Sequence, residues 1–459
     1  MNKKFPNGFL WGSSTNAQQF EGGRNKDDVG LSIADVRIDD GKGMTHEDSN
    51  YDMFQVASDH YHHLEEDIDL YGEMGFQIYR FSMSWTRIFP CGNDEKPNQA
   101  GLDFYNRMLT KLEEYNIQPV CTLYAYDLPL HLVEKYKGFL SRECIDDFLN
   151  YVDVVSKYFK GRIKYYVPFN EQNTMAMISK YCVGVQANNL EEVFLIDHHL
   201  NLAWAKATKI IHQNDANAKV GGNVCNTCIY PATCNPLDIE KADESERAFG
   251  YGYADIFARR KYSLSYLNKY KEIDINTLME EGDLDIIVNA QPDFLSLTYY
   301  MSTLASASEG VGDTLLNTTQ GNPYTKQTEW GWNIDAYGFK RFLVNFYERY
   351  QMPILILENG LGHTDVVEAN GTINDDYRIE YLSEHIKRMQ EAIELGVEII
   401  GYCTWSATDL YSTHEGFEKR YGFVYVDGKT FERKRKKSFY WYKKVIASNG
   451  EDLRNDSVY

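Results

Sequence analysis

The sequence Pro-Ile-Leu-Ile-Leu-Glu-Asn-Gly at residues 353–360 is the most informative stretch of this chain. Four consecutive apolar residues after a proline predict a strand that is buried on both faces, as in a parallel sheet. The run ends at Glu358, and the Asn-Gly pair that follows predicts a turn. The carboxyl ends of the strands form the active-site face of a parallel α/β barrel, so Glu358 is a candidate catalytic residue. The alternative is a carboxylate that simply reaches solvent at a strand end.

A second glutamate follows the same pattern. Residues 164–171 read Lys-Tyr-Tyr-Val-Pro-Phe-Asn-Glu, an apolar run that ends in Asn170 and Glu171. Two strand-terminal carboxylates in one barrel are what the hydrolysis of a glycosidic bond requires. One protonates the leaving oxygen, and the other attacks the sugar or activates water.

Strand-like and helix-like segments alternate along most of the chain. We expect strands at residues 9–12, 76–82, 119–124, 164–170, 218–223, 294–299, 354–357 and 397–405. We expect helices at residues 59–74, 102–115, 144–160, 198–212, 336–350 and 376–395. Loops and short helices are expected at 226–290. With no Gly/Ser-rich linker or short repeat between them, these units predict one α/β domain over residues 1–459, a single (β/α)8 TIM barrel with elaborated βα loops.

Composition excludes several classes of partner. The formal net charge of −20 and the pI near 5.0 argue against nucleic acid and anionic membranes. No apolar run reaches membrane-spanning length, and residues 1–6 lack a secretory leader. We therefore expect a cytoplasmic protein. The basic run at 433–437 precedes aromatic residues, which favours a terminal helix packed on the barrel over a nucleic-acid site.

Cysteine usage points to a reduced protein without a metal. Eight cysteines in 459 residues are too few for a disulfide scaffold. Cys225 and Cys228 form a single C-x-x-C with Cys234 nearby, whereas a zinc ribbon requires a second pair. We expect neither a metal nor an organic cofactor.

Several motifs together resemble glycoside hydrolase family 1. The resemblance covers nearly the whole chain, and each motif is given with its first residue: FLWG from Phe9, QFEG from Gln19, YRFSMSWTRI from Tyr79, FNE from Phe169, LENG from Leu357 and KRYGF from Lys419. It implies a retaining mechanism in which Glu358 is the nucleophile and Glu171 the acid/base. Retaining enzymes hold the two carboxyl groups about 5–5.5 Å apart, and repulsion between them keeps one proton on the pair, here on Glu171.

The resemblance also assigns supporting roles. Arg80, taken to end its strand, would keep Glu358 ionised, and Tyr300 would donate a hydrogen bond to it. Gln19, Asn170 and Trp405 would contact the sugar, and Trp332 would form the platform for the leaving group.

Two departures from the family pattern bear on the substrate. Ala125 stands where the family usually has a histidine, so one sugar contact is missing or is replaced by Tyr124 or Tyr126. Ser412 stands seven residues after Trp405, where plain β-glucosidases carry a glutamate. Ser412, Lys419 and Tyr421 together resemble the phosphate site of the 6-phospho-β-glycosidases.

We therefore expect a retaining 6-phospho-β-glucosidase whose partner is a small phosphorylated β-glucoside. The neighbouring Thr413 resembles the 6-phosphoglucosidases, since the 6-phosphogalactosidases tend to hold a tryptophan there. Two alternatives stay open: a plain β-glucosidase, and a non-catalytic barrel that binds sugar phosphates. The sequence specifies neither the leaving group nor the oligomeric state.

Overall fold

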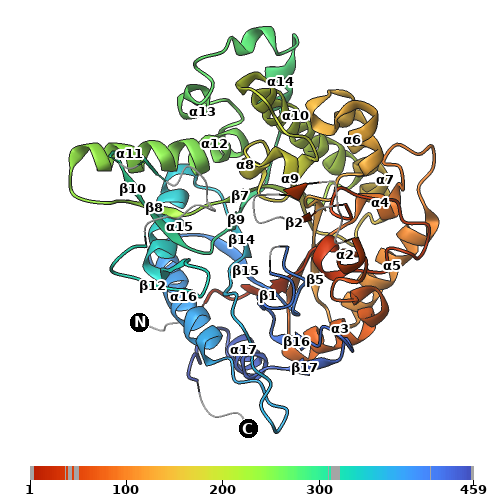
Figure 1. The fold of residues 1–459 in the computed structure, drawn as a ribbon, viewed down its shortest axis with the longest axis vertical. Coiled ribbons are helices and arrows are strands. Elements are labelled where there is room, and N and C mark those ends of the chain that lie inside the picture. Colours follow the sequence, from red (N-terminus) through yellow and green to blue (C-terminus); the bar gives the residue numbers. More distant parts are fainter. Residues whose placement is uncertain are drawn as a thin grey trace.

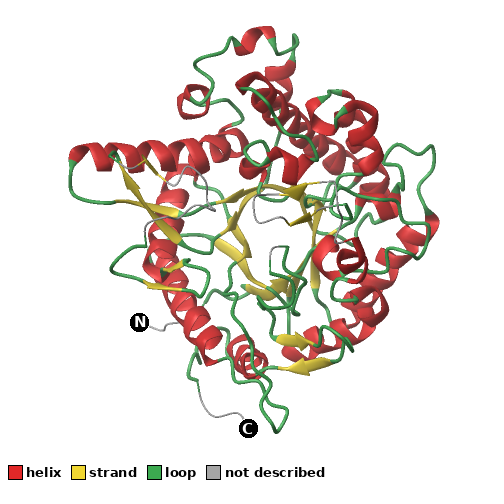
Figure 2. Cartoon of the chain, viewed as in Figure 1, coloured by secondary structure: helices red, strands yellow, loops and turns green. Residues whose placement is uncertain are grey.

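The computed structural model describes residues 5–36, 38–39, 44–45, 51–308, 310–311, 321–413 and 415–455. Eight parallel strands in these residues form a closed barrel that is surrounded by helices (Figures 1 and 2). The strands, in their order around the barrel, are β1 (Leu10–Ser14), β15 (Ile399–Trp405), β14 (Ile354–Glu358), β9 (Phe294–Thr298), β7 (Lys219–Cys225), β6 (Tyr165–Phe169), β5 (Gln118–Tyr124) and β4 (Ile78–Ser82). The expected (β/α)8 TIM barrel is confirmed, and each predicted strand lies within two residues of an observed one.

Burial explains why the strands were predictable. All five residues of β14 are buried, as are all five of β4, β6 and β9. A strand covered on both faces needs an unbroken apolar run, which stands out in the sequence. β1 closes the barrel by pairing in parallel with β15 on one side and with β4 on the other.

The outer helices bury one face each against the barrel. The long ones are α3 (His60–Met74), α5 (Gln99–Glu114), α7 (Glu143–Tyr158), α10 (Leu190–Asn214), α15 (Ala336–Tyr350) and α16 (Asp376–Glu394). Helix α10 begins at Leu190, eight residues before the start that the sequence predicted. Asn189 caps it by accepting a hydrogen bond from the Glu192 amide at 2.8 Å, which the apolar pattern alone does not indicate.

The long βα loops carry short elements. The short helices are α1 (Ala17–Phe20), α2 (Tyr51–Val56), α4 (Trp85–Ile88), α6 (Leu130–Tyr136), α8 (Gln172–Met175), α9 (Ser179–Val183), α11 (Pro236–Glu246), α12 (Gly252–Arg259), α13 (Leu264–Asn268) and α14 (Asp283–Val288). The last four confirm the short helices expected at 226–290. Residues Ile38–Asp39 (β2) and Met44–Thr45 (β3) pair antiparallel.

The sequence did not predict a second sheet beside the barrel (Figure 1). β8 (Cys228–Pro231) pairs with β10 (Ser302–Ser306), which also contacts β11 (Gly310–Val311) and β13 (Asn333–Ile334). β13 pairs with β12 (Lys326–Gln327). This sheet matters for the site because Trp332 directly precedes β13.

The C-terminal segment covers one side of the barrel. β16 (Val424–Val426) and β17 (Arg433–Arg435) form a hairpin, and α17 (Lys437–Ala447) follows. α17 buries Phe439, Trp441 and Tyr442, so the predicted terminal helix is confirmed. Several residues of the basic run form ion pairs, among them Arg433 with Asp67 at 2.9 Å. Within the described residues, none of the helices is long and apolar enough to cross a membrane. That residues 1–459 form one domain stays a prediction.

Candidate active site

Glu358 ends β14 and receives two hydrogen bonds, one from Arg80 on β4 and one from Tyr300 in the segment between β9 and β10. Arg80 Nη1 donates to Glu358 Oε1 at 2.8 Å, and the Tyr300 hydroxyl donates to Glu358 Oε2 at 2.7 Å. Arg80 does not end its strand as expected, because it is the third residue of β4, which continues to Ser82. Its fully buried guanidinium also donates from Nη2 to Asn170 Oδ1 at 2.5 Å. Arg80 therefore connects the segment after β6 with the end of β14.

Glu171 lies two residues beyond the end of β6 and turns the chain into α8. Its backbone adopts a left-handed conformation with φ 42°, which is uncommon for a residue with a side chain. Asn223 on β7 stabilises this turn by accepting a hydrogen bond from the Glu171 amide at 2.5 Å. The Tyr126 hydroxyl donates to Glu171 Oε2 at 2.7 Å. Sequence reasoning missed both of these contacts with Glu171.

The surroundings of the two carboxyl groups affect their pKa values differently. The pKa of Glu358 is raised overall, because burial raises it more than the Arg80 charge and the hydrogen bonds from Tyr300 and Arg80 lower it. Burial also raises the pKa of Glu171, and the negative charge of Glu358 raises it further. Two like charges in one site disfavour double ionisation, and the ion pair between Arg80 and Glu358 predicts that the proton of the pair stays on Glu171.

The residues expected to contact the sugar lie near this pair. Asn170 is buried beside Arg80, and Trp405 ends β15 with its ring packed edge-on against Phe20 at 5.8 Å. Gln19 on α1 donates from Nε2 to the Tyr411 carbonyl at 3.3 Å. Trp332 lies 5.7 Å from the Tyr300 ring.

The three residues expected to bind phosphate also come together. Lys419 Nζ lies 4.1 Å from the Trp332 ring centroid and 6.0 Å from that of Tyr421. Tyr421 belongs to the apolar cluster that contains Phe20 and Trp405. Ser412 Oγ donates to Glu415 Oε2 at 2.8 Å, and Lys419 Nζ lies 3.7 Å from Glu415 Oε1. Sequence reasoning missed Glu415, although its place three residues after Ser412 is a usable signal.

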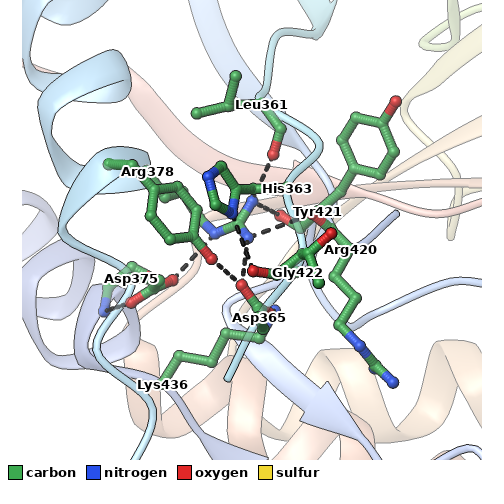
Figure 3. A network of polar contacts seen from close by, with 12 residues as sticks. Leu361, His363, Asp365, Asp375, Arg378, Arg420, Tyr421, Gly422 and Lys436 are labelled. Carbon is green, nitrogen blue, oxygen red and sulfur yellow. Dashed lines mark hydrogen bonds and ion pairs between the residues drawn. The ribbon is translucent and has the colours of Figure 1, made fainter. Parts of the chain in front are cut away.

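A buried network of charges holds the main chain next to Lys419 (Figure 3). Arg378 on α16 donates from Nη1 to the carbonyl oxygens of Leu361 and Tyr421 at 2.5 and 2.9 Å. Asp409 accepts from the Gly422 amide at 2.9 Å and from Lys436 Nζ at 2.6 Å. These contacts fix the backbone on which the side chains of Lys419 and Tyr421 are carried.

The structure also shows what surrounds Ala125, which is buried. The Tyr124 hydroxyl donates to the Cys182 carbonyl, away from both glutamates. The Tyr126 hydroxyl instead reaches Glu171. Of the two tyrosines considered as replacements for the family histidine, Tyr126 is therefore the one whose hydroxyl is seen to contact the acid/base candidate Glu171. All eight cysteines are free, and the described residues contain no cluster of three or more potential metal ligands.

Comparison with known proteins agrees with this geometry. The family model described as "Glycosyl hydrolase family 1" matches residues 1–451. The chain belongs to glycosyl hydrolase family 1. The retaining mechanism is typical of family 1.

Named relatives extend over almost the whole chain. A 6-phospho-beta-glucosidase of Clostridium longisporum is 42% identical, with 98% of each chain covered. An aryl-phospho-beta-D-glucosidase of Bacillus subtilis (strain 168) is 40% identical, with 98% of this chain and 99% of the relative covered. Among solved structures, a family 1 b-glucosidase from Thermotoga maritima is 34% identical with a TM-score of 0.88, covering 98% of this chain and 100% of that one.

Proposed function

We propose that this family 1 protein is a retaining β-glycosidase that hydrolyses β-glucosides phosphorylated at O6. The observation that carries the proposal is the grouping of Ser412, Lys419 and Tyr421 beside Trp332 and Trp405, next to the glutamate pair. Relatives about 40% identical over the full chain are named for activity on phosphorylated glucosides. Those names and these contacts support the same substrate class.

The proposed mechanism is a double displacement at the anomeric carbon. Glu358 attacks that carbon as a carboxylate, and Glu171 gives its proton to the leaving oxygen as the glycosidic bond breaks. Water then attacks the covalent glycosyl–enzyme, Glu171 takes a proton from it, and Glu358 leaves as a carboxylate. Arg80 and Tyr300 favour the ionised form of Glu358, which the attack requires. Asn170 is placed to contact the 2-hydroxyl of the sugar.

Charge explains why the phosphate site fits a phosphorylated sugar. A 6-phosphate carries a charge of about −1.5 to −2 near neutral pH and offers three acceptor oxygens. Lys419 provides a positive charge, and the hydroxyls of Ser412 and Tyr421 can donate hydrogen bonds. A glutamate at 412 would instead repel the phosphate by about 4 kcal/mol per unit charge at 4 Å and an effective dielectric of 20.

The deciding experiment compares a chromogenic β-glucoside with and without its 6-phosphate. The wild-type enzyme should prefer the phosphorylated substrate. Lys419→Ala should raise KM for that substrate about ten- to a hundredfold, because each hydrogen bond to a charged group is worth about 1.5–3 kcal/mol. Ser412→Glu should reject the phosphorylated substrate. Lys326→Ala removes the same charge from an exposed surface pair and serves as the control.

The same data decide between the alternatives. A wild-type enzyme that prefers the plain glucoside, or a Lys419→Ala variant that affects both substrates equally, would support a plain β-glucosidase. Binding of glucose 6-phosphate without hydrolysis of either substrate would support a non-catalytic barrel.

As part of the same proposal, we place the enzyme in the cytoplasm. All eight cysteines are free thiols, of which six are buried, as suits a reducing compartment. The proposed substrate is an anion, which does not cross a bilayer unaided.

A further inference from the structure

Glu415 contacts two of the three residues proposed to bind the phosphate. Its carboxylate accepts a hydrogen bond from Ser412 Oγ at 2.8 Å and lies 3.7 Å from Lys419 Nζ. The Lys419 side chain is only 6% exposed and lies over the rings of Trp330 and Trp332 at 4.7 and 4.1 Å. Glu415 is therefore the anion that accompanies this nearly buried ammonium group.

The contacts of Glu415 and those of a phosphate exclude one another. The Ser412 hydroxyl has one proton, which it can donate either to the carboxylate or to a phosphate oxygen. A carboxylate that stays beside Lys419 would also face the phosphate at short range, and two anions in one small site repel each other strongly. Binding of a phosphorylated sugar therefore requires the Glu415 side chain to move.

We propose that Glu415 fills the phosphate site of the empty enzyme as an internal anion and is displaced by the 6-phosphate of the substrate. This inference rests on the proposed function. It adds a specificity-determining residue, because only a ligand with its own negative charge can replace what Glu415 supplies to Lys419. A neutral glucoside leaves the Glu415–Lys419 pair in place and gains nothing from the site.

The local structure permits the side chain to leave without moving the rest of the loop. Ser412 and Gly416 exchange two backbone hydrogen bonds, at 2.9 and 3.0 Å, which close the base of the loop. The Glu415 side chain is 25% exposed, so solvent already reaches it. Gly416 adopts φ +55°, a conformation that glycine reaches without strain. Rotation of one side chain toward solvent is the smallest change that frees Ser412 and Lys419.

The test measures affinity for the phosphate group in variants of Glu415. Glu415→Gln keeps the shape but removes the charge, and Glu415→Ala removes the competing acceptor as well. Both should lower KM for the 6-phosphorylated chromogenic glucoside and Ki for glucose 6-phosphate about three- to tenfold, the worth of one hydrogen bond. Glu418→Gln is the matched control, since it removes the same charge from an exposed residue three positions further along the chain. A crystal structure of the wild type with glucose 6-phosphate should show Ser412 Oγ bonded to phosphate, with Glu415 turned away.

The possible results separate this inference from the function on which it rests. If the wild type prefers the phosphorylated substrate but Glu415→Gln and Glu415→Ala bind it no better than Glu418→Gln, the inference is wrong and the function stands. A crystal structure with glucose 6-phosphate in which Glu415 still accepts a hydrogen bond from Ser412 would likewise contradict the inference and leave the proposed function in place. If glucose 6-phosphate inhibits the wild type no better than glucose does, both the proposed function and the inference fail.

Discussion

At the scale of single residues, the partners of the two glutamates predict different outcomes when each is removed. Glu358 faces a guanidinium, whereas Glu171 is bonded to a neutral hydroxyl. Glu358→Ala should lose several orders of magnitude in rate and regain turnover with added azide, which replaces the nucleophile and gives the α-glycosyl azide. Glu171→Ala should be rescued mainly on substrates with good leaving groups and give the β-glycosyl azide. Product stereochemistry by NMR is the measurement.

Two results would contradict the proposed mechanism. If the two variants give azides of the opposite stereochemistry, the roles of Glu171 and Glu358 are exchanged. If the wild type releases the α-sugar first, the double displacement is wrong for this enzyme.

Tyr126 predicts a change in pH dependence. Its hydrogen bond stabilises the ionised form of Glu171 and so lowers the pKa of that carboxyl group. The proposed acid must be protonated, so activity falls as pH rises through the Glu171 pKa. Tyr126→Phe removes the donor, which raises this pKa, and the basic limb of the kcat–pH profile should move to higher pH. Tyr124→Phe is the control, because that hydroxyl donates to the Cys182 carbonyl. A limb that stays in place or moves to lower pH in Tyr126→Phe contradicts the assignment.

At the scale of elements, the buried charges behind Lys419 predict a large loss of stability. Asp409 and Lys436 are both fully buried and paired at 2.6 Å. Asp409→Asn leaves this part of the network with an uncompensated positive charge, which should lower the free energy of unfolding by about 3–5 kcal/mol. The measurement is the melting temperature. Glu380→Gln removes a carboxylate from an exposed pair with Lys326 and should change stability by less than about 0.5 kcal/mol. Equal melting temperatures for the two variants would show that the network is not required.

The barrel strands were predictable from sequence because they are almost completely buried. The run from Ile354 to Glu358 has no exposed residue, so nothing interrupts its apolar pattern. The short strand Asn333–Ile334 was not predictable, because two residues carry no periodicity. The early start of α10 depends on a single cap at Asn189, a local signal that outweighs a weak apolar pattern.

In the candidate site, too, some features can be recognised in the sequence and others only in the folded structure. Glu358 and Glu171 stand out in the sequence as candidates, because Glu358 ends one buried strand and Glu171 lies two residues beyond another. The contact of Arg80 with Glu358 does not follow from the apolar pattern, since only a closed barrel shows that a long side chain from within β4 reaches Glu358 across the interior. Asn223 and Tyr126 act through single contacts with Glu171 from neighbouring strands or loops, and such pairs leave no pattern along one chain.

At the scale of the whole molecule, barrel closure joins distant parts of the chain. Ser13 on β1 donates to the Thr404 carbonyl on β15, 391 positions away, and the Tyr442 hydroxyl donates to the Gly12 carbonyl. Also on β1, Trp11 donates from its indole nitrogen to Asn449 Oδ1 at 2.9 Å.

This closure has a consequence for synthesis on the ribosome. β15 (residues 399–405) pairs with both β1 and β14. Until β15 has left the ribosome, each of these two strands lacks a partner along one edge. Each presents an unpaired strand edge, which is a template for association with other chains. Because contacts between such distant segments form slowly, the nascent barrel stays open and prone to aggregation until β15 has been translated and has paired with both strands.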